Sequence, residues 1–198
     1  MAAGWHSRAF LVAALLLVST AALSEPSREG PPWYVPDHAT FQFAGSIGLF
    51  SGGPGWSFLD ESVEAGLLLG WAPPLVAGED FLTLTLKGQL HPFRLEWEGW
   101  SVRPLTVGML FSYTFGDAYF VRLPDRYEDG YYWFKTGLRP ALLLGAGAGR
   151  PVPALGLRLL EGYFELVATD YRIIHFLQDP GTVETGLFSL ALGVRFRF

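Results

Sequence analysis

The side chains that could carry chemistry are few in this chain of 198 residues. The chain has no cysteine, which excludes a disulfide framework, a thiolate zinc site, an iron–sulfur cluster and a cysteine nucleophile. Three histidines, His38, His91 and His175, follow the apolar N-terminal segment, and none has the spacing of a His-x-x-x-His metal motif. The glycine-rich run 145–149 lacks the helix and the lysine that a phosphate-binding loop requires. We therefore expect no metal site, no cofactor and no catalytic residue.

A second set of candidates consists of charged residues on the less apolar faces of the segments described below. The cations are Lys87, Lys135, Arg139, Arg158, Arg195 and Arg197, and the acidic residues available as partners are Glu64, Glu165 and Asp170. A buried charge is costly unless an opposite charge and hydrogen bonds compensate it. We predict that these side chains form a paired network, and the alternative is a selectivity ring or a ligand site.

The segments that must position these charges have a period of two. In residues 188–198, large apolar residues occupy every even position, and small or cationic residues occupy every odd one. Successive side chains of a β-strand point to opposite sides, so this alternation predicts a strand with one apolar and one polar face. The strand is long enough to cross a bilayer at the usual tilt, which takes roughly 9–11 residues.

The same alternation recurs along the chain and predicts eight strands. Their ranges are 39–50, 61–72, 80–91, 103–116, 131–148, 154–160, 162–174 and 185–198. Residues 51–55, 123–130 and 178–181 have the glycine, proline and aspartate content of turns. The count is open, because residues 94–100 could pair as a strand and the junction 160–162 could be a bulge; ten strands are the alternative. Pro140 would remove a ladder hydrogen bond, so we expect a bulge or a later strand start there.

The N-terminal segment has a different pattern. Residues 1–24 contain Arg8 as their one charged side chain, then an apolar run over 9–18, and end at Ser24 before Glu25. This pattern predicts a secretory signal peptide, because the run is shorter than the roughly 20 residues of a spanning helix. Prolines in residues 25–37 predict an extended, unpaired leader. The expected organisation is a signal peptide (1–24), a proline-rich leader (25–37) and a barrel (38–198).

Composition points to a membrane environment. Charged residues make up 17% of the chain, against about 25% in soluble proteins, and 50% of the residues are hydrophobic. The formal net charge of −5 and the scattered basic residues argue against a nucleic-acid partner. In hydrocarbon, only helices and closed barrels pair all their backbone groups, and no segment after the signal peptide is apolar for long enough to be a spanning helix. We therefore predict an all-β, closed antiparallel transmembrane β-barrel of about eight strands, with the apolar faces outward.

The signal peptide, the amphipathic strands and the last five residues, 194–198, together resemble a small outer-membrane β-barrel protein of a Gram-negative bacterium. Val194, Phe196 and Phe198 are similar to the signal by which the barrel-assembly machinery recognises such proteins. The resemblance implies residence in the outer membrane and contact with its lipid, and it transfers no active site. Aromatic residues near the ends of predicted strands are expected in the two interfacial girdles of such a barrel; they are Trp71, Tyr113, Phe115, Tyr131, Tyr132, Trp133 and Phe134.

The resemblance and the residues favour a non-enzymatic barrel with a structural or surface-interaction role, whose loop partners the sequence does not identify. One alternative is a narrow pore or hydrophobic-ligand channel. Another is a lipid A-modifying barrel hydrolase, which would use a histidine and a serine two positions apart. His38-Ala39-Thr40 is the nearest approach to that pattern, and its threonine departs from it. A soluble lipocalin-like barrel would invert the faces, because periodicity does not distinguish inside from outside.

Overall fold

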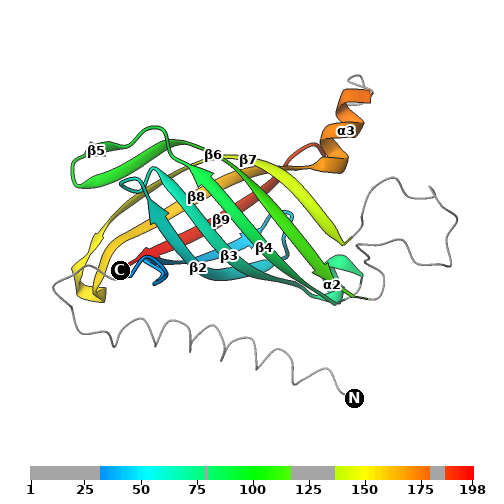
Figure 1. Ribbon diagram of the computed structural model, residues 1–198, viewed down its shortest axis with the longest axis horizontal. Helices are drawn as coiled ribbons and strands as arrows, with labels where there is room; N and C mark the ends of the chain where they lie inside the picture. The colour runs from blue at the N-terminus through cyan, green and yellow to red at the C-terminus, as the bar shows by residue number, and fades with distance from the viewer. Residues whose placement is uncertain (1–31, 79, 117–136, 179–185) are drawn as a thin grey trace, which may run out of the picture.

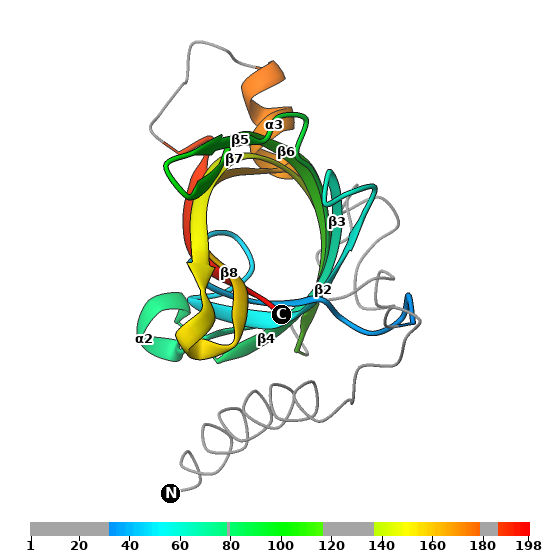
Figure 2. The same ribbon diagram turned by 90° about the vertical axis from the view of Figure 1, so that its left-hand side faces the viewer.

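The strands form one antiparallel sheet that closes into a barrel (Figure 1). The computed structural model describes residues 32–78, 80–116, 137–178 and 186–198. The strands are β1 (His38–Ala44), β2 (Phe50–Phe58), β3 (Val63–Ala72), β4 (Phe81–Leu90), β5 (Leu95–Trp97), β6 (Trp100–Phe115), β7 (Leu138–Val152), β8 (Leu157–Thr169) and β9 (Ser189–Arg197). Their order is β4-β3-β2-β1-β9-β8-β7-β6-β5, and a further β4–β6 pairing closes the ring, so eight strands form the wall and β5 pairs only with β6. Figure 2 shows this ring from one end. The prediction of a closed eight-stranded antiparallel barrel is confirmed.

The first predicted strand is wrong in its extent. Residues 39–50 hold β1, a loop at 45–49 and the first residue of β2, and the predicted turn at 51–55 lies inside β2. These glycines serve close packing, because a Cβ on Gly53 would lie 2.0 Å from the Leu67 carbonyl oxygen and a Cβ on Gly55 would lie 2.1 Å from His38 Nε2. The glycine-rich composition of residues 51–55 therefore reflects close neighbours in the sheet and not a turn.

The predicted strands 154–160 and 162–174 are also wrong. Residues 157–169 form the single strand β8, whose ladder with β7 continues through Glu161 and Gly162. The period of two ends at Thr169, and the helix α3 (Asp170–Gln178) follows. The predicted total of eight thus combined one strand too few near β1 with one too many at β8. Of the candidate strand 94–100, residues 95–97 form β5, which is joined to β6 by a turn with positive φ at Glu98 and Gly99.

The prolines do not all interrupt the sheet where we expected. Pro140 lies in register in β7, paired with Phe111, and the β7–β8 ladder begins only at the next residue, Ala141. No bulge occurs at Pro140, whereas the expected later start holds for the β7–β8 ladder, although the pairing with β6 already includes Leu138 to Pro140. Register shifts occur instead between Arg103 and Thr106, around Pro104, and between Arg150 and Val152, around Pro151.

The two ends of the barrel differ in their connections. At the end where β1 begins and β9 ends, called here the terminal end, the links are residues 59–62, 91–99 and 153–156, the last with a short 3-10 helix, η1 (Pro153–Leu155). At the opposite end, the loop end, they are 45–49, 73–80 with the one-turn helix α2 (Pro74–Ala77), 116–137, and 170–188 with α3. The two longest connections, 116–137 and 170–188, thus leave the same end, opposite to the start of β1 and the end of β9 (Figure 1).

The outer wall of the barrel is apolar and its inner wall is mostly polar. On β4, Leu82, Leu84, Leu86 and Leu90 are exposed, and they alternate with the buried side chains of Thr83, Thr85, Lys87 and Gln89. The same alternation on β9 exposes Leu190 and Leu192 and buries Arg195 and Arg197. The apolar faces point outward, as predicted, and the lipocalin-like alternative with apolar residues inside is wrong.

No helix among the described residues is long and apolar enough to cross a membrane.

The described end of the predicted leader is folded against the barrel. Val35 N donates to Pro32 O at 2.9 Å in a turn, and Trp56 Nε1 on β2 donates to Tyr34 O at 2.9 Å. Asp37 N donates to Gly55 O at 3.0 Å, and Phe198 N donates to Asp37 O at 3.0 Å. Residues 32–37 therefore differ from the extended, unpaired leader that the prolines suggested. The predicted signal peptide lies outside the described residues.

Candidate functional site

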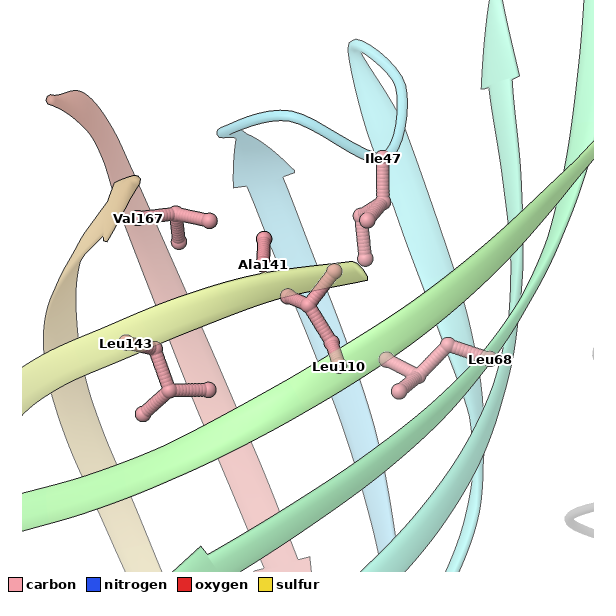
Figure 3. Close-up of a cluster of buried hydrophobic side chains, with 6 residues drawn as sticks. All are labelled: Ile47, Leu68, Leu110, Ala141, Leu143 and Val167. Carbon is pink, nitrogen blue, oxygen red and sulfur yellow. The ribbon is translucent and has the colours of Figure 1, made fainter. Parts of the chain in front are cut away.

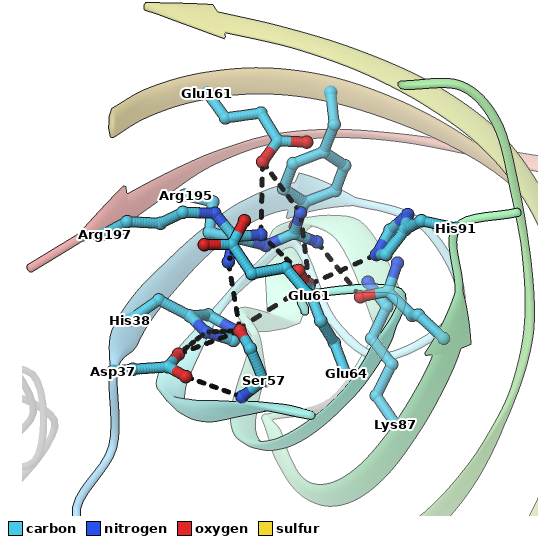
Figure 4. A network of polar contacts seen from close by, with 12 residues as sticks. Asp37, His38, Ser57, Glu61, Glu64, Lys87, His91, Glu161, Arg195 and Arg197 are labelled. Atoms are coloured by element: carbon cyan, nitrogen blue, oxygen red, sulfur yellow. Dashed lines mark hydrogen bonds and ion pairs between the residues drawn. The ribbon is translucent and has the colours of Figure 1, made fainter. Parts of the chain in front are cut away.

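The strongest concentration of charge lies inside the barrel at the terminal end (Figure 4). Glu64 on β3 and Glu161 on β8 face Arg103 on β6 and Arg195 and Arg197 on β9. All five side chains are buried. The arginine cluster, as we call these five residues together with Glu61, contains three carboxylates and three guanidiniums and is therefore charge-balanced.

Each of the two buried carboxylates contacts all three arginines. Glu64 Oε1 accepts from Arg103 Nη1 at 2.6 Å and from Arg197 Nη2, and Glu64 Oε2 lies 3.3 Å from Arg195 Nη1. Glu161 Oε2 lies 3.4 Å from Arg103 Nη1, 3.1 Å from Arg195 Nη1 and 3.4 Å from Arg197 Nη2. A buried charge remains stable only when its partners are in place, and this geometry compensates each guanidinium twice.

The sixth member, Glu61, comes from the turn between β2 and β3. Its Oε2 lies 2.9 Å from Arg103 Nη2 and 3.6 Å from Arg197 Nη1, and its Oε1 lies 2.5 Å from Arg158 Nη1. It also pairs with Arg94. Burial raises the pKa of the Glu61 carboxyl, but the charges of Arg197, Arg158 and Arg94 outweigh it and hold that pKa below its ordinary value. Glu61 therefore joins the turn to four other segments of the terminal end.

The turn that carries Glu61 has an unusual backbone. Leu59, Asp60 and Glu61 all have positive φ, of 51°, 53° and 63°. Three consecutive non-glycine residues in the left-handed region are strained, at about 1–2 kcal/mol each. The ion pairs of Glu61 connect this turn to its neighbours beside an open depression of about 420 Å³, whose lining includes Asp37, Asp60, Arg94 and Arg158.

A second polar layer lies deeper in the barrel. Lys87 Nζ donates to Glu165 Oε2 at 2.6 Å and to Gln42 Oε1 at 3.0 Å, and Gln89 Nε2 donates to Glu165 Oε1 at 2.9 Å. Arg195 Nη2 donates to Gln89 Oε1 at 3.0 Å and so links this layer to the arginine cluster.

Tyr163 lies within the second layer. The Tyr163 ring lies 5.1 Å from the Arg195 guanidinium and 5.2 Å from Lys87 Nζ, at distances typical of cation–π contacts. Gly193 makes room for the ring, because a Cβ there would lie 2.2 Å from Tyr163 Cζ. The aromatic side chain thus fills the barrel at the level of the Lys87–Glu165 pair.

The buried apolar side chains of the interior gather toward the loop end (Figure 3), beside small buried polar side chains such as Thr83, Thr85 and Ser112. Its buried core, called here the apolar plug, consists of Ile47, Leu68, Leu110, Ala141, Leu143 and Val167. Ile47 comes from the loop between β1 and β2, which folds inward, with Thr83 Oγ1 donating to the Ile47 carbonyl. A Cβ on Gly70 would lie 1.9 Å from that carbonyl oxygen, so glycine at position 70 permits the inward fold.

Asp37, His38 and Ser57 lie together at the terminal end, but their geometry differs from a catalytic triad. Asp37 Oδ1 lies 2.5 Å from His38 Nδ1, and Ser57 Oγ lies 3.4 Å from the same nitrogen. A catalytic histidine binds its serine and its carboxylate through opposite ring nitrogens. Here Ser57 Oγ donates to Asp37 Oδ1 at 3.0 Å and accepts from Arg197 Nη1 at 3.0 Å, which is a structural role.

The carboxyl group of Asp37 is stabilised in its charged form. Burial raises the pKa of Asp37, but hydrogen bonds from His38 and Ser57 outweigh it and leave that pKa below its ordinary value. His38 itself is 3% exposed and points into the barrel, with Nε2 at 4.0 Å from Glu64 Oε2. His38 and Thr40, two positions apart on β1, share the inner face with Gln42, away from the apolar outer wall where a barrel enzyme would meet lipid.

The structure brings together five of the nine charged residues that the sequence suggested. Lys87, Glu165, Arg195 and Arg197, together with Glu64, lie inside the barrel. Arg158 lies at the rim of the terminal end, beside Glu61. Arg139 and Asp170 pair at 3.6 Å at the loop end, apart from the arginine cluster, so including them in one network was wrong. Lys135 lies outside the described residues.

Sequence reasoning missed Arg103, Glu161 and Glu61. Arg103 is an even number of residues away from the outward Phe111, so an uninterrupted alternation would place Arg103 outward as well. The register shift around Pro104 reverses the alternation and places its side chain inside the barrel. Pro104, a proline inside an alternating strand, is the sequence feature that could have indicated this shift. Glu161 was assigned to a junction between strands, and Glu61 to the start of a strand. The sequence identified His91 as a histidine but did not predict its place beside the arginine cluster; its Nε2 lies 3.3 Å from Glu64 Oε2 and its Nδ1 lies 3.0 Å from Thr106 Oγ1.

No group of three histidine, aspartate or glutamate side chains within the described ranges is arranged to hold a metal ion. Comparison of the chain with protein-family models, with curated proteins and with solved structures found no match. The chemistry of the interior must therefore be interpreted from its own geometry.

Proposed function

We propose that this chain is an integral β-barrel protein of a bacterial outer membrane, with a sealed interior, that anchors and presents the long connections of its loop end. The observation that carries this proposal is the distribution of charge. The described barrel buries its ion pairs and exposes its leucines and phenylalanines, which is the reverse of a water-soluble protein. A wall of this kind is stable where hydrocarbon surrounds it.

The order of residues along the outer wall supports a membrane setting. Near the terminal end, the exposed aromatic residues include Trp33, Trp97 and Trp100, and near the loop end they include Phe43, Tyr113 and Phe115. Leucines such as Leu86 and Leu144 lie between these two bands. The exposed rings of Phe111 and Phe164 also lie in this middle band, so the band is apolar rather than purely aliphatic. An apolar band flanked by aromatic girdles at the two levels of the bilayer interface is typical of membrane barrels.

The filled interior supports a sealed barrel rather than a pore. The arginine cluster, the Lys87–Glu165 layer and the apolar plug follow one another along the axis, and each is made of buried side chains. A barrel of about eight strands is just wide enough for its own side chains to fill. A solute would have to break a charge-balanced cluster and then pass an apolar core.

The connections support a presenting role. The first strand, β1, begins and the last strand, β9, ends at one end, and the two longest connections, 116–137 and 170–188, leave the other. In outer-membrane barrels the termini and short turns face the periplasm and the longer loops face outward. By that rule the loop end faces the outside of the cell.

The proposal is tested by expressing the full chain in a Gram-negative host and separating soluble, inner-membrane and outer-membrane fractions. We expect the protein in the outer-membrane fraction, with faster gel mobility before boiling than after it. Recovery in the soluble fraction, without a heat-dependent mobility shift, would contradict the proposal.

Planar bilayer recording tests the sealed interior separately. We expect the purified barrel to give no reproducible conductance steps. Regular steps from protein that passes the mobility test would replace the sealed barrel with the narrow pore. Mass spectrometry of lipid A after overexpression tests the enzyme alternative, and we expect unchanged lipid A.

A further inference from the structure

The helix α3 leaves the barrel in an unusual direction. It begins directly after β8, at Asp170, and extends sideways from the wall rather than along the barrel axis (Figure 1). Figure 2, which views the molecule along the barrel, also shows α3 outside the ring of strands. None of the residues of α3 is buried. The helix therefore projects into the space that surrounds the barrel.

Six of the nine residues of α3 form two stripes. Ile173, Phe176 and Leu177 have the i, i+3, i+4 spacing that places them on one side of a helix. Tyr171, His175 and Gln178 have the i, i+4, i+7 spacing of another side, and the Tyr171 and His175 rings stack at 6.0 Å. Phe176 and Leu177 are exposed. A short amphipathic helix with an apolar stripe and no covering core is typical of an interfacial helix.

Polar contacts at its first turn fix the helix to the wall. Asp170 Oδ1 lies 3.6 Å from Arg139 Nη1 on β7, and Arg172 Nη1 donates to Ser189 Oγ on β9 at 2.8 Å. The outer wall around this point is apolar, with Leu142, Phe188 and Leu190 exposed. The helix α3 therefore begins at the loop-end border of the apolar outer wall and extends sideways from it (Figure 1).

We propose that α3 is an interfacial helix that lies on the bilayer around the barrel, with Ile173, Phe176 and Leu177 at the boundary between acyl chains and headgroups and His175 and Gln178 toward water. This inference rests on the proposed membrane location. Lipid is chosen as the occupant because the helix projects sideways at the level where the apolar wall ends. Nine residues span about 13 Å, so α3 widens the footprint of the barrel in one leaflet.

The absence of cysteine allows a direct test with single-cysteine variants of the full chain. I173C and L177C report the apolar stripe, H175C and Q178C report the polar stripe, and L86C on β4 reports the outer wall. Each variant is labelled with a nitroxide and reconstituted in phosphatidylethanolamine–phosphatidylglycerol vesicles. Collision with lipid-soluble oxygen is then compared with collision with a water-soluble nickel chelate. The heat-dependent mobility shift verifies folding of each variant.

We expect the oxygen-to-nickel accessibility ratio at I173C and L177C to approach that at L86C, and the ratio at H175C and Q178C to be clearly lower. Low ratios at all four helix positions, with a high ratio at L86C, would overturn the interfacial helix and leave the membrane barrel intact. Protection of L177C from both reagents would mean that protein covers the stripe, which also overturns the inference. A low ratio at L86C would instead contradict the membrane location itself.

Discussion

At the terminal end the barrel interior holds three arginines and three glutamates, whereas toward the loop end it holds the apolar plug around Leu68 and Leu110. The same strands supply both halves. On β3 the inward residues change from Glu64 to Leu68, and on β8 they change from Glu161 and Glu165 to Val167. A single strand therefore contributes charged inward side chains at one level of the barrel and apolar inward side chains at another. The comparison shows that one narrow barrel can be closed either by compensated charges or by close apolar packing.

The two fillings respond differently to perturbation. An ion-paired cluster depends on each member, because removing one partner leaves an uncompensated buried charge. An apolar core loses contacts and gains a cavity, and its response depends on how far its neighbours relax. Substitutions matched between the halves distinguish these two responses.

The largest effect is expected for Glu64→Gln in the arginine cluster. The amide is nearly the same size as the carboxylate, but it leaves Arg103, Arg195 and Arg197 with fewer compensating charges. We expect the free energy of unfolding to fall by about 4 kcal/mol, measured by urea titration of the detergent-solubilised barrel with tryptophan fluorescence. Glu61→Gln, at the partly solvated rim, is the control and is expected to have a smaller effect. Equal losses would show that Glu64 is not the centre of the cluster.

Leu68→Ala tests the apolar plug by the same titration. We expect a loss of about 3 kcal/mol, from lost contacts and the cavity left behind. Leu86→Ala on the outer wall, where detergent or lipid fills the space, is the matched control and is expected to lose less. If the two leucine variants were equally stable, the apolar plug would not be a packed core.

Gly70→Ala tests the inward fold of the loop 45–49. A Cβ at this position would lie 1.9 Å from the Ile47 carbonyl oxygen and 2.4 Å from Thr83 Oγ1, so the loop must shift. We expect a loss of about 2 kcal/mol, typical of overpacking. Gly88→Ala is the control, because a Cβ there has no neighbour within 4 Å. If the two variants were equally stable, the loop 45–49 would be able to move away from position 70 without loss of stability, which would contradict the prediction.

The smallest expected effect is a pH dependence that belongs only to the charged half. Glu61 has a lowered pKa in the folded protein, so its stabilising contribution is full above the ordinary value of 4.5 and is lost as the pH falls through the folded value. Because the group is partly solvated, we expect less than about 1 kcal/mol. Wild type should lose this amount between neutral and acidic pH, and Glu61→Gln should lose less. If Glu61→Gln lost as much stability at acidic pH as the wild type, the pH dependence would not come from Glu61.

The strands that the sequence located well are those with an undisturbed alternation. Residues 80–91 correspond closely to β4, and residues 185–198 contain β9, which begins at Ser189. Inward positions from Leu82 onward in β4 and throughout β9 are small, polar or charged, and outward positions are large and apolar with the exception of Gly88. The alternation also identified Lys87, Arg195 and Arg197 as inward residues, because they lie on the less apolar face of their strands.

The remaining elements depend on contacts that no local pattern encodes. Gly53 and Gly55 resemble turn residues but lie in β2, where they accommodate Leu67 and His38 from neighbouring strands. Arg103 became an inward residue through the register shift around Pro104, which reverses the facing of the residues that follow. The partners of Glu61 come from segments far away in the sequence, so its role required the closed ring.

The seam between β1 and β9 has a consequence for the order of assembly. The last strand of the chain pairs with the first, and it alone brings Arg195 and Arg197 to Glu64 and Glu161. Without β9, the carboxylates of Glu64 and Glu161 would keep Arg103 as their one arginine partner within the arginine cluster. Ring closure and neutralisation of that excess negative charge are therefore one event. Docking of β9 therefore couples closure of the barrel to charge compensation of Glu64 and Glu161.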